Sequence, residues 1–293
     1  MSNRAAYMAA TAVGSGAAAY ALYSWRSSSA SPPFPAAAEP AAAGDAPPYT
    51  IGTSGWAAPG APAGHRLASA WCLMPHPEKV YKGGEDAAFG SPHAIGVADG
   101  VGGWAERGVD PGLYSKGLME AARQMAEGAP PPGTPTPTAL LRGAYDVIEG
   151  RRVLGSTTAI VATLQSVGPA AATVHFANLG DSGIMIVRPA EGGAQKVYRS
   201  VEQQHAFNFP FQLGGGSSDK PECATPAAAV QAGAGRLPPD RVGFVGRHAV
   251  TESVAVEVGD LLMLGTDGLF DNLFDEELLA IVEQHLQGKH GLG

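Results

Sequence analysis

Cysteine and basic charge are both scarce in this chain of 293 residues. Its two cysteines, Cys72 and Cys223, are too few for the disulfide framework of a small secreted domain, and such sparse use fits a reducing interior. The 19 lysines and arginines face 27 aspartates and glutamates, which gives a formal net charge of −8. Without a basic face, the composition argues against a nucleic-acid partner. The 8 histidines show no HExxH-like spacing, which argues against a zinc site.

Acidic residues are also missing from the N-terminal segment. Before Glu39 the chain has no aspartate or glutamate, and its basic residues there are Arg4 and Arg26. This acid-poor, Ala/Ser-rich composition is typical of an organelle transit peptide, while residues 7–23 form a nearly unbroken apolar run of marginal membrane-spanning length. We therefore expect residues 1–30 to be an import signal or a weak membrane anchor. Residues 31–64, rich in Pro, Ala and Gly, are expected to be a disordered linker.

Residues 65–293 have the pattern of one α+β domain. Strand-like and helix-like segments follow in series without βαβ alternation, which favours α+β over α/β. The strands expected over 157–187 should form an antiparallel meander, and the last two strands a hairpin. Residues 214–240, rich in Gly, Ala and Pro, should be a mobile surface excursion. Helices are expected over 112–127, 138–150 and 275–287, and strands over 67–73, 94–98, 157–164, 172–177, 183–187, 196–199, 254–258 and 261–264.

Four short acid clusters carry most of the functional information. Each places an acid beside glycine or at the end of an apolar run, where a strand would stop. Carboxylates delivered from several strand ends, with no matching lysines or arginines nearby, are what hard divalent cations require. The clusters are Gly84-Glu85-Asp86, Val97-Ala98-Asp99-Gly100, Asn178-Leu179-Gly180-Asp181-Ser182-Gly183 and Gly265-Thr266-Asp267-Gly268-Leu269-Phe270-Asp271-Asn272.

The two Asp-Gly pairs predict the chemistry of this metal site. An acid at the end of a buried strand projects into a groove, and the following glycine lets the backbone bend so that its carbonyl can also face a cation. If the strands before Asp99 and Asp267 are neighbours, both acids converge on one metal pair. Two cations about 3.5–4 Å apart can bridge a water, lower its pKa and clamp a phosphoryl group. A lone Asp-Gly pair is usually only a turn, but two pairs with two further acid clusters favour phosphate-ester hydrolysis.

The clusters together resemble one known family. The stretches that begin at Val97, Leu154 (Leu-Gly-Ser-Thr-Thr-Ala), Asn178 and Gly265 are similar to the metal-dependent Ser/Thr phosphatases of the protein phosphatase 2C type. The similarity covers roughly residues 65–287 in the family's motif order, and it is closest to the organellar branch. It implies a four-layer α-β-β-α sandwich, phosphoprotein substrates, a monomeric enzyme, and a mitochondrial location with a plastid as second choice.

The resemblance also implies a role for each acid. Asp99 would bridge two Mn²⁺ or Mg²⁺ ions, with the Gly100 carbonyl on one of them, and Asp267 would hold the second ion. Glu85 would bind through a metal-bound water, and Asp86 would hydrogen-bond the water that attacks phosphorus. Two further acids match a third, weaker metal site in relatives, namely Asp181 and Asp271.

Three departures from the family pattern bear on activity. Val101 stands where most members have a histidine proposed as general acid. Tyr81 stands where an arginine usually grips the substrate phosphate, and the neighbouring Lys82 is a weak replacement. The sequence ends at Gly293 without the Asp-Asp-Ile/Val-Thr segment that carries another metal ligand, so the catalytic domain looks C-terminally incomplete. We expect weak metal binding and low activity from the chain as given. The alternative function is that of a catalytically impaired relative that binds phosphoproteins or a partner enzyme.

Overall fold

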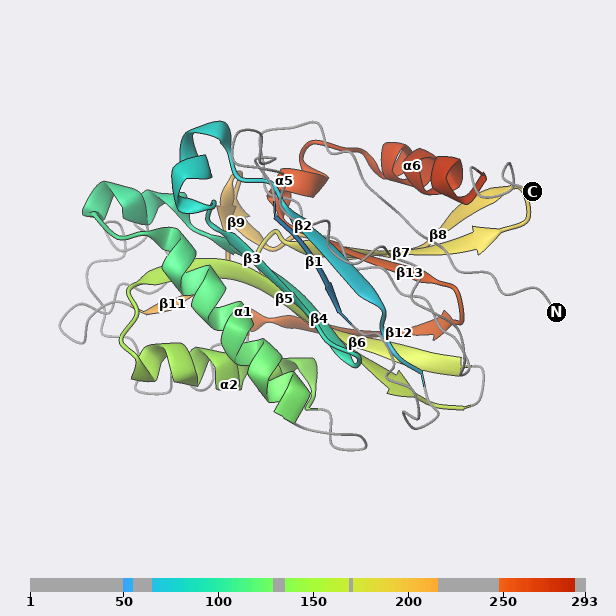
Figure 1. Ribbon diagram of the computed structural model, residues 1–293, viewed down its shortest axis with the longest axis horizontal. Helices are drawn as coiled ribbons and strands as arrows, with labels where there is room; N and C mark the ends of the chain where they lie inside the picture. The colour runs from blue at the N-terminus through green and yellow to red at the C-terminus, as the bar shows by residue number, and fades with distance from the viewer. Residues whose placement is uncertain (1–49, 55–64, 129–134, 169–170, 216–247, 288–293) are drawn as a thin grey trace, which may run out of the picture.

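The computed structural model describes residues 50–54, 65–128, 135–168, 171–215 and 248–287. Two antiparallel β-sheets lie face to face, and helices cover the outer side of each (Figure 1). In chain order the elements are β1 Thr50–Ser54, β2 Ser69–Leu73, the 3₁₀-helix η1 Pro77–Lys82, β3 Asp86–Gly90, β4 Ala94–Gly100, the 3₁₀-helix η2 Gly102–Arg107, α1 Pro111–Gly128, α2 Pro137–Gly150, β5 Gly155–Ser166, β6 Ala171–Leu179, β7 Gly183–Ala190, β8 Gly193–Arg199, β9 Gln204–Ala206, β10 Phe209–Pro210, β11 Leu213–Gly215, β12 Val250–Glu257, β13 Leu261–Gly265, α5 Asp267–Phe270 and α6 Asp275–Gln287.

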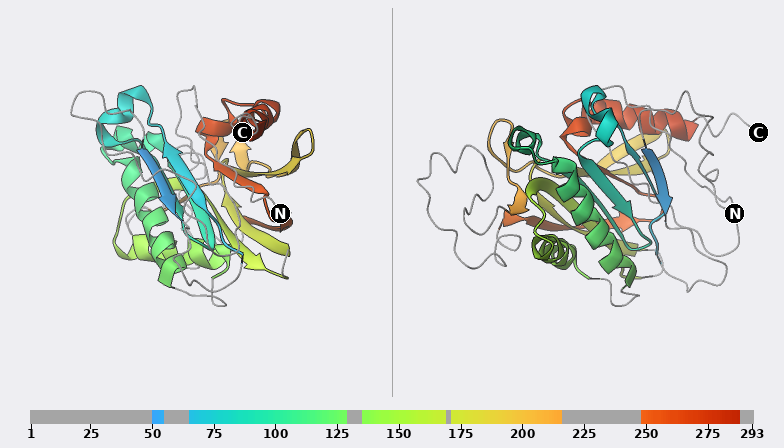
Figure 2. Two further views of the ribbon diagram at one scale, coloured as in Figure 1. Left: turned by 45° about the vertical axis from the view of Figure 1, so that its right-hand side comes forward. Right: turned by 60° about the vertical axis from the view of Figure 1, so that its left-hand side comes forward.

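These elements form four layers. The large sheet has the strand order β12-β6-β5-β4-β3, with β11 added on β5, and the small sheet has the order β13-β7-β8. Helices α1 and α2 pack on the large sheet, whereas α6 packs on β7 and β8 of the small sheet. Figure 2 shows these helices on opposite outer sides of the two sheets. The expected four-layer α-β-β-α sandwich is therefore confirmed.

The apolar pattern of β5 shows how one strand serves two cores. Side chains alternate between the faces of a strand, so a strand covered on both sides must be apolar throughout. Ala159 and Val161 face the core under α1 and α2, whereas Ile160 and Ala162 face the core between the sheets. A third core lies between the small sheet and α6. β5 is thus fixed between two layers, and the residues at the ends of its neighbouring strands are held in place with it.

Helix α1 covers the large sheet through one stripe of side chains. Tyr114, Leu118, Ala121 and Ala122 recur at the spacing of one helix face, and all four are buried in the core against the sheet. Helix α2 begins with Pro137 at its first position, where a missing N–H costs nothing, and the Thr136 hydroxyl accepts a 3.2 Å hydrogen bond from the Ala139 N–H. The helices expected over 112–127, 138–150 and 275–287 are α1, α2 and α6.

Two expected strand pairings are wrong. β5 and β6 pair as expected, but β7 belongs to the small sheet. The chain turns out of the large sheet at Gly180, which has φ 103°, and the Asn178 side-chain amide holds this turn by donating to the Ser182 carbonyl. The hairpin expected from the last two strands is also absent, since β12 pairs with β6 and β13 pairs with β7. A short connection that contains a glycine usually predicts a hairpin turn, but here both connections lead from one sheet to the other.

The segment boundaries need two corrections. The linker expected over 31–64 includes β1, whose Thr50–Ser54 pairs antiparallel with β2, and the excursion expected over 214–240 begins inside β11. The remainder of both segments, and the import signal or anchor expected over 1–30, lies outside the described residues. In the described part of the chain, no helix is both long enough and apolar enough to cross a membrane.

Candidate active site

Two acids lie side by side where β3 and β4 meet. Asp86 at the start of β3 stands directly opposite Asp99 near the end of β4 in the antiparallel register. The next residue, Gly100, donates its N–H to the Glu85 carbonyl at 3.1 Å. A Cβ at Gly100 would lie 2.6 Å from the Pro111 carbonyl oxygen and 2.8 Å from that of Glu85, so only glycine fits here. The turn after Asp99 is therefore held firmly against the N-terminus of α1.

Asp267 reaches the same place from the other sheet. It follows β13 and opens the one-turn helix α5, and its side chain interacts closely with that of Asp99. The convergence of the two acids was expected if their strands are neighbours; β4 belongs to the large sheet and β13 to the small one. The two aspartates therefore meet across the sandwich and not along one sheet.

Asp181 completes a group of four acids. It lies in the turn between β6 and β7, is 5% exposed, and interacts electrostatically with Asp267 and with Asp271 after α5. Asp271 itself is exposed and lies at the edge of the group. Glu202, which lies between β8 and β9, also acts electrostatically on Asp181. We call Asp86, Asp99, Asp181 and Asp267 the acid group.

The acid group is electrostatically strained without a cation. Burial, and next the negative charge of Asp267, raise the pKa of both Asp86 and Asp181 to about 7. Burial and the carboxylates of Asp86 and Asp267 raise the pKa of Asp99 well above its usual value. Among the described residues, no lysine or arginine forms an ion pair with these four acids.

This donor set fits a hard divalent cation such as Mn²⁺ or Mg²⁺, because it consists of carboxylate oxygens whose charge is not neutralised. Within the described ranges, no group of three or more His, Cys, Asp or Glu side chains is placed so that it could hold a metal ion by itself. Mg²⁺ keeps several waters in protein sites and is held by only one or two carboxylates, so its binding would not require such a group.

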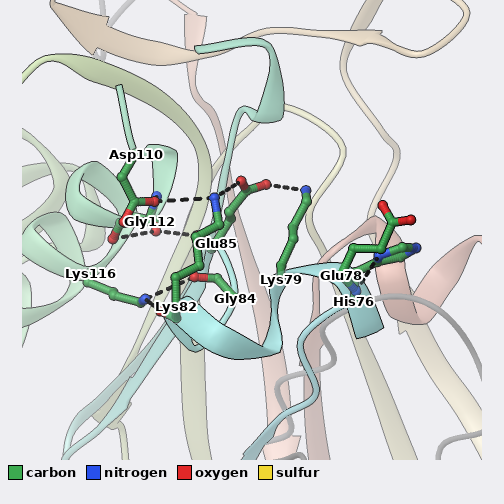
Figure 3. Close-up of polar contacts among 10 residues, drawn as sticks. His76, Glu78, Lys79, Lys82, Gly84, Glu85, Asp110, Gly112 and Lys116 are labelled. Carbon is green, nitrogen blue, oxygen red and sulfur yellow. Dashed lines mark hydrogen bonds and ion pairs between the residues drawn. The ribbon is translucent and has the colours of Figure 1, made fainter. Parts of the chain in front are cut away.

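Glu85 has different partners from those expected. Its carboxylate is 4% exposed and accepts hydrogen bonds from Lys79 on one oxygen and from Lys82, at 2.7 Å, on the other (Figure 3). The expectation that no basic side chains accompany the acid clusters is therefore wrong for Glu85. The cause is η1, because residues three apart lie on the same side of a 3₁₀-helix and both lysines project over the carboxylate.

The two lysines are not equivalent. Lys82 is 17% exposed and also lies 3.5 Å from Asp110, so it is held between two acids. Lys79 is 39% exposed and acts electrostatically on Asp86, which places it at the solvent side of the site. Lys116 of α1 fixes the loop below them by donating to the backbone carbonyls of Gly84 at 2.9 Å and Lys82 at 3.2 Å (Figure 3). The sequence analysis missed Lys79 and Lys116.

The two residues that depart from the family pattern, Tyr81 and Val101, differ in their exposure. Tyr81 is 86% exposed, whereas Val101 is partly buried and donates its N–H to the Ser156 carbonyl at 2.9 Å. Two threonines support the acids from β5: the Thr157 hydroxyl donates to the Asp99 carbonyl at 2.6 Å, and the Thr158 hydroxyl lies 2.8 Å from that of Ser182. The Thr-Thr pair in the motif that begins at Leu154 was the available sequence signal for these supports.

Comparison with known proteins places the chain among phosphatases. The probable protein phosphatase 2C 55 of Arabidopsis thaliana is 41% identical over 219 residues, which cover 74% of this chain and 39% of that protein. The protein phosphatase PTC7 homolog of Homo sapiens is 37% identical over 207 residues, which cover 67% of this chain and 58% of that protein. The chain thus spans between 39% and 60% of the length of the curated relatives that it matches.

A solved structure shares the architecture. The photosystem II phosphatase PBCP is 27% identical with a TM-score of 0.53, and the match covers 82% of this chain and 77% of that one. No family model matches the chain. The sequence similarities, the shared fold, and the acid group contributed by both sheets show that the chain belongs to the protein phosphatase 2C family.

Proposed function

We propose that the chain carries the catalytic site of a Mn²⁺- or Mg²⁺-dependent phosphatase that hydrolyses phosphoserine and phosphothreonine in proteins. The observation that carries this proposal is the acid group, whose carboxylates come from both sheets and form no ion pair with a lysine or arginine among the described residues. Clustered carboxylates that repel one another cost stability unless a cation offsets their charge. The names of the relatives support the same activity.

The proposed metal-holding residues divide between the sheets. Asp99 and the Gly100 carbonyl would act from the large sheet and Asp267 from the small one, with Asp181 and Asp271 at a third, weaker position. A bound cation pair supplies a water of lowered pKa and positive charge for the phosphoryl group. Each Glu85 oxygen accepts one lysine hydrogen bond and keeps a free lone pair, so Glu85 would still accept a hydrogen bond from a metal-bound water.

Three residues of this chain would handle the substrate. Asp86, partly buried beside Asp99, would accept a hydrogen bond from the attacking water and fix its direction toward phosphorus. Lys79, the more exposed of the two Glu85 partners, would bind the phosphate in place of the arginine that relatives carry where this chain has Tyr81. Val101 supplies no proton to the leaving group.

Location and partners follow as further proposals. We place the protein in an organelle, a mitochondrion first and a plastid second, on the composition of residues 1–30 and the similarity to PTC7 homologs. Phosphoproteins are the proposed partners, with weak membrane association through the N-terminus and a monomeric state. Fractionation of the native organism, with mass determination of the mature N-terminus, tests the location.

The deciding experiment is Mn²⁺-dependent hydrolysis of p-nitrophenyl phosphate and of a phosphothreonine peptide by the chain and by its Asp99→Asn variant. Metal-dependent turnover that is lost in the variant is the expected result. A folded chain that binds the peptide without turning it over would instead establish the phosphoprotein-binding role.

A further inference from the structure

The one-turn helix α5 positions two of the candidate metal ligands. Asp267 is its first residue and Asp271 follows its last, so the placement of this single turn sets the direction of both carboxylates. A helix this short makes too few hydrogen bonds to hold itself, because nucleation costs more than one turn returns. Its fixed position must come from Leu269, which is 1% exposed, and from the neighbouring Phe270.

Arg199, the last residue of β8, covers Phe270. The guanidinium carbon lies 3.6 Å from the centre of the ring, well within the distance at which a cation is attracted to an aromatic face. The Arg199 side chain is 18% exposed, its Nε lies 3.5 Å from Asp275, and its Nη1 donates to the Ser200 carbonyl at 3.1 Å. The guanidinium is thus held by an ion pair and a hydrogen bond while its central carbon lies over the ring.

Two glycines make room for this stack. Gly183 and Gly265 are paired across β7 and β13. A Cβ on Gly183 would lie 2.5 Å from Arg199 Nη1 and 3.3 Å from a ring carbon of Phe270, and a Cβ on Gly265 would lie 3.0 Å from the same ring carbon. The stack therefore rests on the two strand ends next to Asp181 and Asp267, directly beside the acid group.

We propose that Arg199 is a positioning residue that clamps Phe270 and thereby fixes the direction in which α5 presents its two aspartates to a divalent cation. This inference rests on the proposed function, because it concerns the same metal site. Arg199 does not touch the substrate. Its planar guanidinium matters as much as its charge, because an ammonium group cannot stack in the same way.

The test measures Mn²⁺ affinity by calorimetry without substrate in Arg199→Lys, Phe270→Leu and the double variant. Lysine keeps a charge for Asp275 but removes the flat stacking surface. Each single variant should weaken Mn²⁺ binding about tenfold, in line with the strength of a desolvated cation–π contact. The double variant should bind no more weakly than either single variant, since both remove one shared contact.

Arg188→Lys is the matched control. Arg188 lies on β7 of the same sheet and pairs with Asp260 at 2.7 Å, away from α5. The Arg188→Lys variant should at most have a lower melting temperature, and its Mn²⁺ affinity should be unchanged. Equal Mn²⁺ affinity in the folded Arg199→Lys variant and the unaltered chain would overturn the inference while leaving the proposed function intact. If that variant does not fold, Phe270→Leu decides in the same way. An unaltered chain that binds no Mn²⁺ would refute the proposed function, and this inference with it.

Discussion

Asp86 and Asp99 occupy directly opposed positions on β3 and β4, so two carboxylates face each other across one pair of strands. Like charges in this arrangement destabilise a sheet, and here burial adds to the cost. The pair is therefore a place where the fold gives up stability to hold charge close to a reaction centre.

Asp99→Asn should separate stability from function. Without metal, at a pH high enough to ionise both carboxyl groups, the variant should be more stable by about 1 kcal/mol, because the amide removes one of two facing charges. With Mn²⁺, the proposed phosphatase activity should fall about 10³-fold, since a proposed metal ligand is lost. Chemical denaturation in EDTA and initial rates in Mn²⁺ measure the two effects. Lower stability of the metal-free variant would contradict the assigned repulsion.

The stability of the metal-free protein should decrease as pH rises. The pKa of Asp86 and of Asp181 is about 7 in the folded state against 3.8 as the ordinary value, so between these values the folded state binds more protons than the unfolded state. Their contribution is thus most favourable below 3.8 and is lost as the pH rises toward about 7. The melting temperature in EDTA should be lower at pH 8 than at pH 5.5, conditions on either side of that folded-state pKa.

Mn²⁺ should reduce this pH difference, because the cation replaces protons as the partner of the carboxylates. Asp181→Asn should flatten the profile in EDTA by removing one of the two titrating groups. A melting temperature in EDTA that rises between these two pH values would show that the two carboxyl groups titrate normally.

Replacement of each lysine partner of Glu85 by alanine should give a different effect, one on substrate binding and the other on stability. Lys79→Ala should raise KM for a phosphopeptide and the inhibition constant of inorganic phosphate about tenfold, the worth of one charge-assisted hydrogen bond. Lys82→Ala should mainly lower the melting temperature, because it takes the better-buried partner from the Glu85 carboxylate. Steady-state kinetics and thermal melting on both variants measure this difference. Equal KM values for Lys79→Ala and the unaltered chain would remove Lys79 from the phosphate site.

Gly100→Ala should destabilise the fold by about 2 kcal/mol, because its methyl group would collide with backbone carbonyls that cannot move aside easily. Gly150 at the end of α2 offers the control, since a Cβ there meets nothing within 4 Å. Gly150→Ala should change stability by no more than about 0.5 kcal/mol. Urea denaturation of the two variants measures the difference, and similar stabilities would show that the turn after Asp99 is loose.

Much of this arrangement could be predicted from local sequence, because the signals are local. Apolar runs of strand length and helical spacing located the helices and most strands, and Asp-Gly after such a run located Asp99 and Asp267. The partner of a strand is not a local property. β7 and β13 show which side chains point inward, but nothing in their periodicity says that they pair with each other across a long sequence separation.

The basic side chains around the site illustrate the same limit. Lys79 and Lys82 meet over Glu85 only because η1 forms a 3₁₀ turn, and lysines on a short polar segment usually face water. Arg199 and Phe270 are distant in sequence, and two glycines on other strands create the space in which they stack. Contacts of this kind depend on the completed fold.

Asp99 and Asp267 come from different sheets, so the distance between their carboxylates depends on how the two sheets are positioned relative to each other. Apolar side chains such as Ile160 and Ile184 form the close-packed contact between the sheets, so the shape of this core sets how one sheet lies on the other. A small sliding displacement would open or close the gap between the two carboxylates. Substitutions deep in that core should therefore change the affinity of the proposed metal site from a distance, through the alignment of the two sheets.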